Sequence, residues 1–125
     1  MRLRVVILEN TASNLQRLTD IIKEVAPDAI IKGFTEGNAA LAWCNENAFC
    51  VDVFIGNWWG TSEESKSPEG ANVYHMVNWC RKPRRFLIAD EPMFERWSYR
   101  DGADGFIQRP ATKETLQKLF EKIRN

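Results

Sequence analysis

The chain has 125 residues, which is enough for one globular domain spanning residues 1–125. Its 17 Lys and Arg residues balance 17 Asp and Glu residues. This balance argues against the strongly basic surface with which many proteins bind nucleic acid or anionic membranes. A protein partner is therefore favoured, and we expect neither nucleic-acid binding by this domain nor a membrane partner.

Cysteine, histidine and apolar residues are distributed as in a cytoplasmic protein. The chain has three cysteines without a Cys-x-x-Cys pair and a single histidine, His75, which is a poor set of zinc ligands. A membrane-spanning helix needs about 20 apolar residues, and no apolar run in the chain is close to that length. We expect reduced thiols and a cytoplasmic location. The end at Asn125 is compatible with a protein that stands alone and with the N-terminal part of a longer one.

Five predicted strands alternate with five predicted helices. Apolar, β-branched runs predict strands, and apolar residues at helical spacing predict helices between them, with Thr35 as the N-cap of the second helix. This alternation predicts a parallel sheet with helices on both faces, whose functional crevice lies at the carboxyl ends of the strands. The expected strands are 4–8, 29–34, 51–56, 86–89 and 105–108; the expected helices lie near 15–25, 36–43, 73–80, 93–97 and 116–123.

Three segments resemble the receiver domain of two-component response regulators. Residues 102–112 read GADGFIQRPAT, similar to the family's Gly-Ala-x-Gly-aromatic-x-x-Lys-Pro run. Residues 36–41 resemble the entry to its second helix, and residues 5–10 its first strand with an acidic pair. The resemblance covers nearly the whole chain and implies a flavodoxin-like (βα)5 sandwich with strand order 2-1-3-4-5.

The resemblance also implies that most phosphorylation residues have been replaced. The acidic pair that holds Mg²⁺ falls on Glu9 and Asn10, and the phosphoacceptor aspartate falls on Asn57. An amide is a poor nucleophile and a weak ligand for a hard dication. We therefore expect no Mg²⁺, no other cofactor and no enzymatic activity.

The other side of the family's site is altered as well. The hydroxyl residue that bonds the phosphoryl group falls on Ala89, or on Asp90 if the register shifts by one residue. The phosphate-binding lysine falls on Arg109. We expect Arg109 to form an ion pair with Glu9 that closes the crevice, because its fork matches a carboxylate. The resemblance further implies a cis bond at Pro110 that holds Arg109 inward.

These replacements predict a degenerate receiver that acts without phosphorylation, as a protein-interaction module in bacterial signal transduction or transcription control. A kinase, another receiver or an output domain are the expected partners, and a homodimer through the fourth and fifth helices is compatible with the family. Two alternatives stay open: a receiver that still switches through Glu9 or Asp90, and a small flavodoxin-like ligand binder or enzyme. The candidate interaction residues are the aromatic side chains Trp58, Trp59, Trp97, Tyr99 and Phe106. The polar segment 60–70 is expected to be a surface loop, with no role assigned to it.

Overall fold

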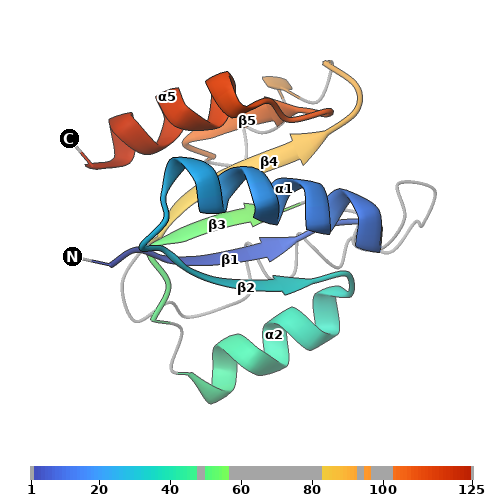
Figure 1. Ribbon diagram of the computed structural model, residues 1–125. Helices are drawn as coiled ribbons and strands as arrows, with labels where there is room; N and C mark the ends of the chain where they lie inside the picture. Colours follow the sequence, from blue (N-terminus) through green and yellow to red (C-terminus); the bar gives the residue numbers. More distant parts are fainter. Residues whose placement is uncertain (1, 48–49, 57–82, 93–94, 97–102, 125) are drawn as a thin grey trace.

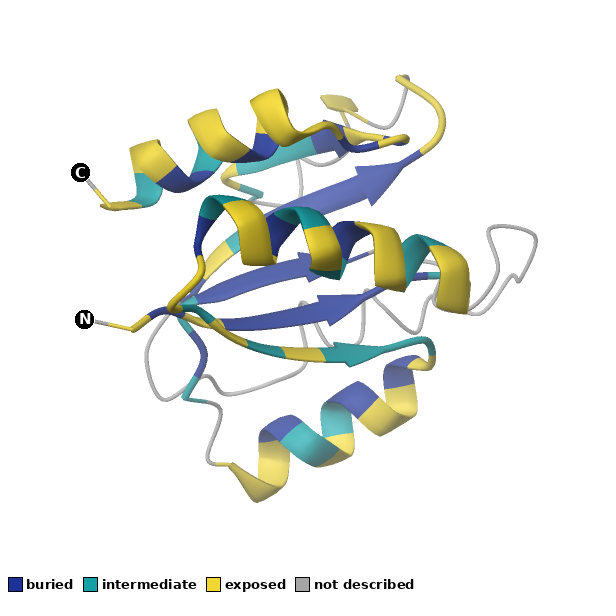
Figure 2. Cartoon of the chain, viewed as in Figure 1, coloured by how far each residue is buried: buried dark blue, intermediate teal, exposed yellow. Residues whose placement is uncertain are grey.

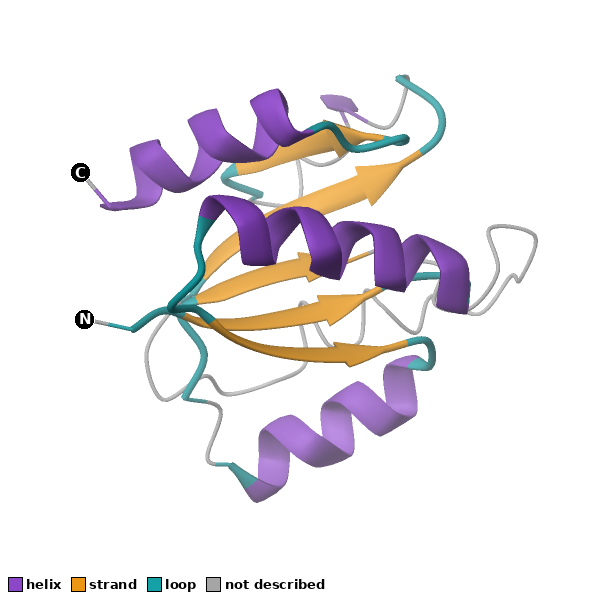
Figure 3. Ribbon diagram, in the orientation of Figure 1, coloured by secondary structure: helices purple, strands orange, loops and turns teal. Residues whose placement is uncertain are grey.

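The computed structural model describes residues 2–47, 50–56, 83–92, 95–96 and 103–124 (Figure 1). Five strands form one parallel sheet in the order β2-β1-β3-β4-β5, and all five arrows point the same way (Figure 3). The predicted strand order is therefore confirmed. The strands are β1 (Arg4–Leu8), β2 (Ile30–Phe34), β3 (Val53–Gly56), β4 (Arg84–Ala89) and β5 (Gly105–Gln108).

Helices cover both faces of the sheet. The described helices are α1 (Ala12–Val25), α2 (Gly37–Glu46) and α5 (Lys113–Arg124). Helices α1 and α5 pack against one face through side chains that include Leu18 and Phe120, and α2 packs against the other through Ala40 and Cys44. Strand β3 is buried throughout, and β1 and β4 are buried apart from their first residues, whereas β2 at the edge is partly exposed (Figure 2). Such two-sided burial explains why the central strands read as continuous apolar runs.

Several expected elements lie outside the described residues. These are the helices near 73–80 and 93–97 and the loop 60–70, so the expected count of five helices is untested. Among the described helices, none is both long enough and apolar enough to cross a membrane.

Three strands begin at positions other than those predicted. Strand β2 begins at Ile30 rather than at Ala29, whose amide closes the preceding turn by donating to the carbonyl of Ala26 at 3.0 Å. Strand β3 begins at Val53 rather than at residue 51. Strand β4 begins at Arg84, two residues earlier than predicted, and Arg84 pairs with Val53. Hydrophobic patterning missed this start, because the first residue of β4 has a charged, exposed side chain.

The expected N-cap of the second helix is wrong. The cap is Glu36, not Thr35, and its side chain makes no capping hydrogen bond. Helix α1 has the arrangement that sequence preferences favour, since the Thr11 hydroxyl accepts a hydrogen bond from the backbone of Asn14 at 3.1 Å. Helix α2 begins at Gly37, which is one residue later than it would begin if Thr35 were its N-cap.

Candidate functional site

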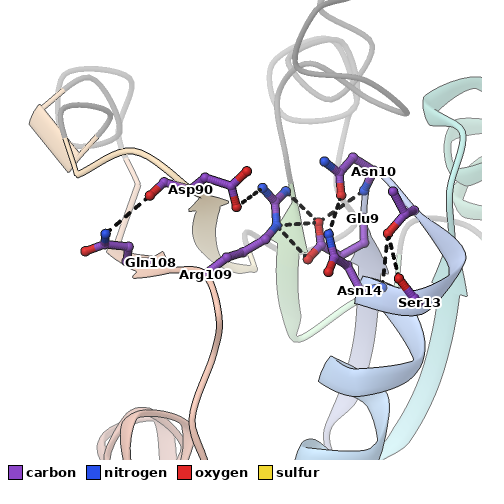
Figure 4. Close-up of polar contacts among 8 residues, drawn as sticks. Glu9, Asn10, Ser13, Asn14, Asp90, Gln108 and Arg109 are labelled. Carbon is purple, nitrogen blue, oxygen red and sulfur yellow. Dashed lines mark hydrogen bonds and ion pairs between the residues drawn. The ribbon is translucent and has the colours of Figure 1, made fainter.

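Three charged side chains meet at the carboxyl edge of the sheet. Glu9 follows β1, Asp90 follows β4, and Arg109 follows β5. Parallel strands bring their carboxyl ends to the same edge, so residues 100 positions apart in the chain become neighbours. Figure 4 shows the guanidinium of Arg109 between the two carboxylates.

The ion pair between Glu9 and Arg109 is bidentate and buried. Arg109 Nη2 donates to Glu9 Oε1 at 2.6 Å, and Nε lies 3.1 Å from Oε1 and 2.9 Å from Oε2. Glu9 is 1% exposed and Arg109 is 9% exposed. The planar fork of arginine binds both oxygens of a carboxylate in this way. The ion pair predicted from the sequence is confirmed.

Asp90 holds the opposite edge of the same guanidinium. Its Oδ1 accepts a hydrogen bond from Arg109 Nη1 at 3.1 Å, and its side chain is 54% exposed. Its backbone carbonyl also accepts a hydrogen bond from the Gln108 side chain at 3.2 Å. Asp90 was predicted as an alternative for Ala89 and as a candidate atypical phosphoacceptor, but its contact with Arg109 was not predicted. Asp90 directly follows a strand, as Arg109 does, and this shared position was the feature of the sequence that indicated a contact between them.

Hydrogen bonds with β2, with the backbone between β1 and α1, and with α1 itself hold Glu9 and Asn10 in place. The Glu9 amide donates to the carbonyl of Phe34 at 2.9 Å, and the Asn10 amide donates to Glu9 Oε1 at 3.1 Å. The side-chain oxygen of Asn10 accepts a hydrogen bond from Asn14 Nδ2 at 2.8 Å (Figure 4). Both side chains therefore already have partners within the protein.

Among the described residues, the donor set at this edge of the sheet does not fit a Mg²⁺ site. Mg²⁺ requires hard oxygen ligands in near-octahedral geometry, usually one or two carboxylates. Both oxygens of Glu9 are bound to the guanidinium, and the described residues contain no group of three acidic, His or Cys side chains able to hold a metal. The cavity beside the ion pair measures only ≈ 10 Å³. The buried cation in this crevice is thus the side chain of Arg109.

Other predicted site residues are placed as follows. Ala89 ends β4, is buried, and its carbonyl accepts a hydrogen bond from the Arg109 amide at 2.9 Å. The bond between Arg109 and Pro110 is cis, as expected. Phe106 is half-buried on β5. The remaining predicted residues lie outside the described part of the chain: Asn57, Trp58, Trp59, Trp97 and Tyr99.

The sequence matches no known protein family. It also matches no curated protein.

Solved structures nevertheless share its fold. A response regulator receiver protein from Burkholderia phymatum has a TM-score of 0.77 at 13% identity, covering 98% of this chain and 94% of that one. The chemotaxis protein CheY4 of Vibrio cholerae has a TM-score of 0.76 at 17% identity, covering 98% and 99%. The signal receiver domain of a putative Luxo repressor protein from Vibrio parahaemolyticus has a TM-score of 0.75 at 16% identity, covering 98% of this chain and 90% of that one. The fold is therefore that of receiver domains.

Proposed function

We propose that this chain is a receiver-like module that binds protein partners without being phosphorylated, in bacterial signal transduction or transcription control. The observation that carries this proposal is the buried ion pair between Glu9 and Arg109. It occupies the edge of the sheet at which receiver-like folds present their functional residues. The fold shared with receiver proteins supports the signalling role.

Loss of phosphoryl transfer follows from the chemistry of the site. Phosphoryl transfer depends on positioning and on cations that neutralise the transferred group. Asn57 brings an amide where a nucleophilic carboxylate would be needed, and the Asn10 amide adds no negative charge for a dication. Binding of Mg²⁺ would require Glu9 to leave Arg109, and the buried guanidinium would then lose its strongest partner.

A partner surface is available on β5 and α5. A groove of ≈ 270 Å³ lies there, and its lining includes Phe86, Gly105 and Phe106. The basic side chains of Lys118 and Lys122 line it. An apolar centre with a polar rim is typical of protein-binding surfaces. A kinase, another receiver, an output domain or a second copy of this chain are the partner classes that we propose for it.

The experiment that tests the proposed function is intact-mass measurement. The protein is incubated with Mg²⁺ and a small acyl phosphate, and an Asn57→Asp variant is treated in parallel. We expect no phosphoryl adduct on the unmodified chain, because residue 57 is an amide and both oxygens of Glu9 are bound to Arg109. An adduct would contradict the proposal. Its location at Glu9 or Asp90 would then identify a receiver that still switches through an atypical acid.

A further inference from the structure

A second groove lies at the opposite end of the strands from the ion pair. It measures ≈ 350 Å³ and opens between the end of α2 and the first residues of β1 and β2. The site of Glu9 and Arg109 is at the carboxyl ends of the same sheet. The groove is lined by Arg4, Val5, Val6, Ile30, Lys32, Trp43, Asn47 and Cys50.

The groove exists because α2 carries few large side chains toward the sheet. Its buried residues are Gly37, Ala40 and Cys44, all of them small. Trp43 is the large exception, and its ring packs against Phe34 with centroids 6.1 Å apart. The last residues of α2 are polar and exposed, so nothing in this helix fills the space above the starts of β1 and β2.

Apolar surface is exposed at the rim of this groove. Ile30 is 48% exposed and is the most exposed large hydrophobic side chain in the described part of the chain. It begins β2, the edge strand that Figure 2 shows as less buried than its neighbours. Val6 and Trp43 add further apolar lining. The groove therefore offers a place for an aliphatic or aromatic side chain of a partner.

The charge of the groove is positive. Lys32 and Arg4 line it, and no carboxylate belongs to the described lining. Lys32 forms no ion pair with any described residue, and its Nζ lies 5.9 Å from the ring centroid of Phe34. Asp52 accepts a hydrogen bond from the Arg4 backbone at 2.8 Å and weakens the positive potential on that side. Lys32 is therefore the main electrostatic contact for a partner.

We infer that this groove docks a short acidic segment of a protein partner, with one aliphatic or aromatic side chain seated between Ile30 and Trp43 and a carboxylate at Lys32. Charge complementarity favours this occupant. The site is separate from the crevice of Glu9 and Arg109 and from the groove on β5 and α5. The inference does not depend on whether the chain accepts a phosphoryl group.

The test is a selection of displayed short random peptides on the full chain, followed by affinity measurement of the enriched peptides. We expect these peptides to carry Asp or Glu beside an aliphatic or aromatic residue. The Lys32→Glu variant should weaken binding at least about tenfold, because it replaces attraction by repulsion. The matched control is Lys23→Glu, an exposed charge reversal on α1 across the sheet, which should leave binding nearly unchanged.

A structural measurement keeps the test specific. Both variants must show the same far-ultraviolet circular dichroism as the parent protein, and bound peptide should shift the amide resonances of Ile30 and Trp43. Three outcomes would overturn the inference: no enriched peptide, enriched peptides without acidic residues, or unchanged binding to Lys32→Glu. A dimer of the chain that Lys32→Glu dissociates would also overturn it and would assign the groove to a second copy.

Discussion

At the scale of single residues, the ion pair of Glu9 and Arg109 is the main buried polar contact of the described crevice. A buried salt bridge contributes little net stability, because desolvation offsets the attraction between the charges. Removal of one partner is costly, since it leaves the other charge buried. The pair is therefore better explained as a device that neutralises and fills the crevice than as a source of stability.

Replacement of Glu9 by Gln should lower the free energy of unfolding by about 3 kcal/mol, near the lower end for a broken buried pair, because Asp90 still contacts Arg109. Urea unfolding followed by circular dichroism measures this change. The control is Glu24→Gln, which removes an exposed ion pair to Lys113 and should cost less than about 1 kcal/mol.

A double variant separates the cost of the unpaired charge from that of lost packing. Glu9→Leu combined with Arg109→Met should be more stable than either single variant, because no buried charge remains. Additive destabilisation in the urea series would contradict this explanation. It would indicate that lost packing, rather than an unpaired charge, causes the destabilisation at Glu9 and Arg109.

At the scale of elements, β3 leads to the crevice through a tightly packed end. Gly56 is buried, and a Cβ atom there would lie 2.6 Å from two ring atoms of Phe54. The Phe54 ring is itself fully buried, so it has little room to move. Gly33 on β2 would also place a Cβ 2.6 Å from a neighbour, but that neighbour is the end of the half-buried Leu15 side chain.

The variant Gly56→Ala should therefore destabilise the protein by about 1–3 kcal/mol, the usual cost of overpacking a core. Gly33→Ala should cost less, because Leu15 can change its rotamer. Thermal unfolding of the two variants at equal concentration measures the difference. Equal midpoints would show that the Phe54 ring moves as easily as the Leu15 side chain.

Much of the sheet was predictable from the sequence, because buried parallel strands produce apolar runs. The beginning of β4 was not, since two arginines precede its apolar run and do not follow a hydrophobic pattern. At the site, Arg109 and Glu9 were predictable as a pair because both follow strands at one edge. The contact of Asp90 with Arg109 was missed, because the pairing of a half-exposed carboxylate depends on side-chain direction, which hydrophobic patterns do not encode.

At the scale of the whole molecule, a buried thiol between α2 and the sheet makes stability depend on pH. Burial raises the pKa of the Cys44 thiol on the α2 face from 9.0 to about 11. In the unfolded chain this thiol loses its proton at lower pH than in the folded protein. The contribution of the neutral thiol to stability is thus complete below pH 9 and is lost as the pH rises toward 11.

As the pH rises from 9.0 to about 11, the free energy of unfolding should accordingly fall more steeply for the parent protein than for a Cys44→Ala variant. The difference in slope should approach about 1.4 kcal/mol per pH unit for one proton. Urea unfolding at several alkaline pH values measures both slopes, and the comparison cancels the titration of shared Lys and Tyr residues. Parallel curves would contradict the assignment of this pH dependence to Cys44.

The central claim is that the guanidinium of Arg109 takes the place of a metal ion in the crevice. It is tested most directly by titration with Mn²⁺, a paramagnetic substitute for Mg²⁺, observed as broadening of backbone amide resonances. The account predicts no saturable broadening at Glu9, Asn10 or Asp90. Saturable broadening of these three resonances that Mg²⁺ reverses would contradict it, because it would show that a dication displaces Arg109 from Glu9.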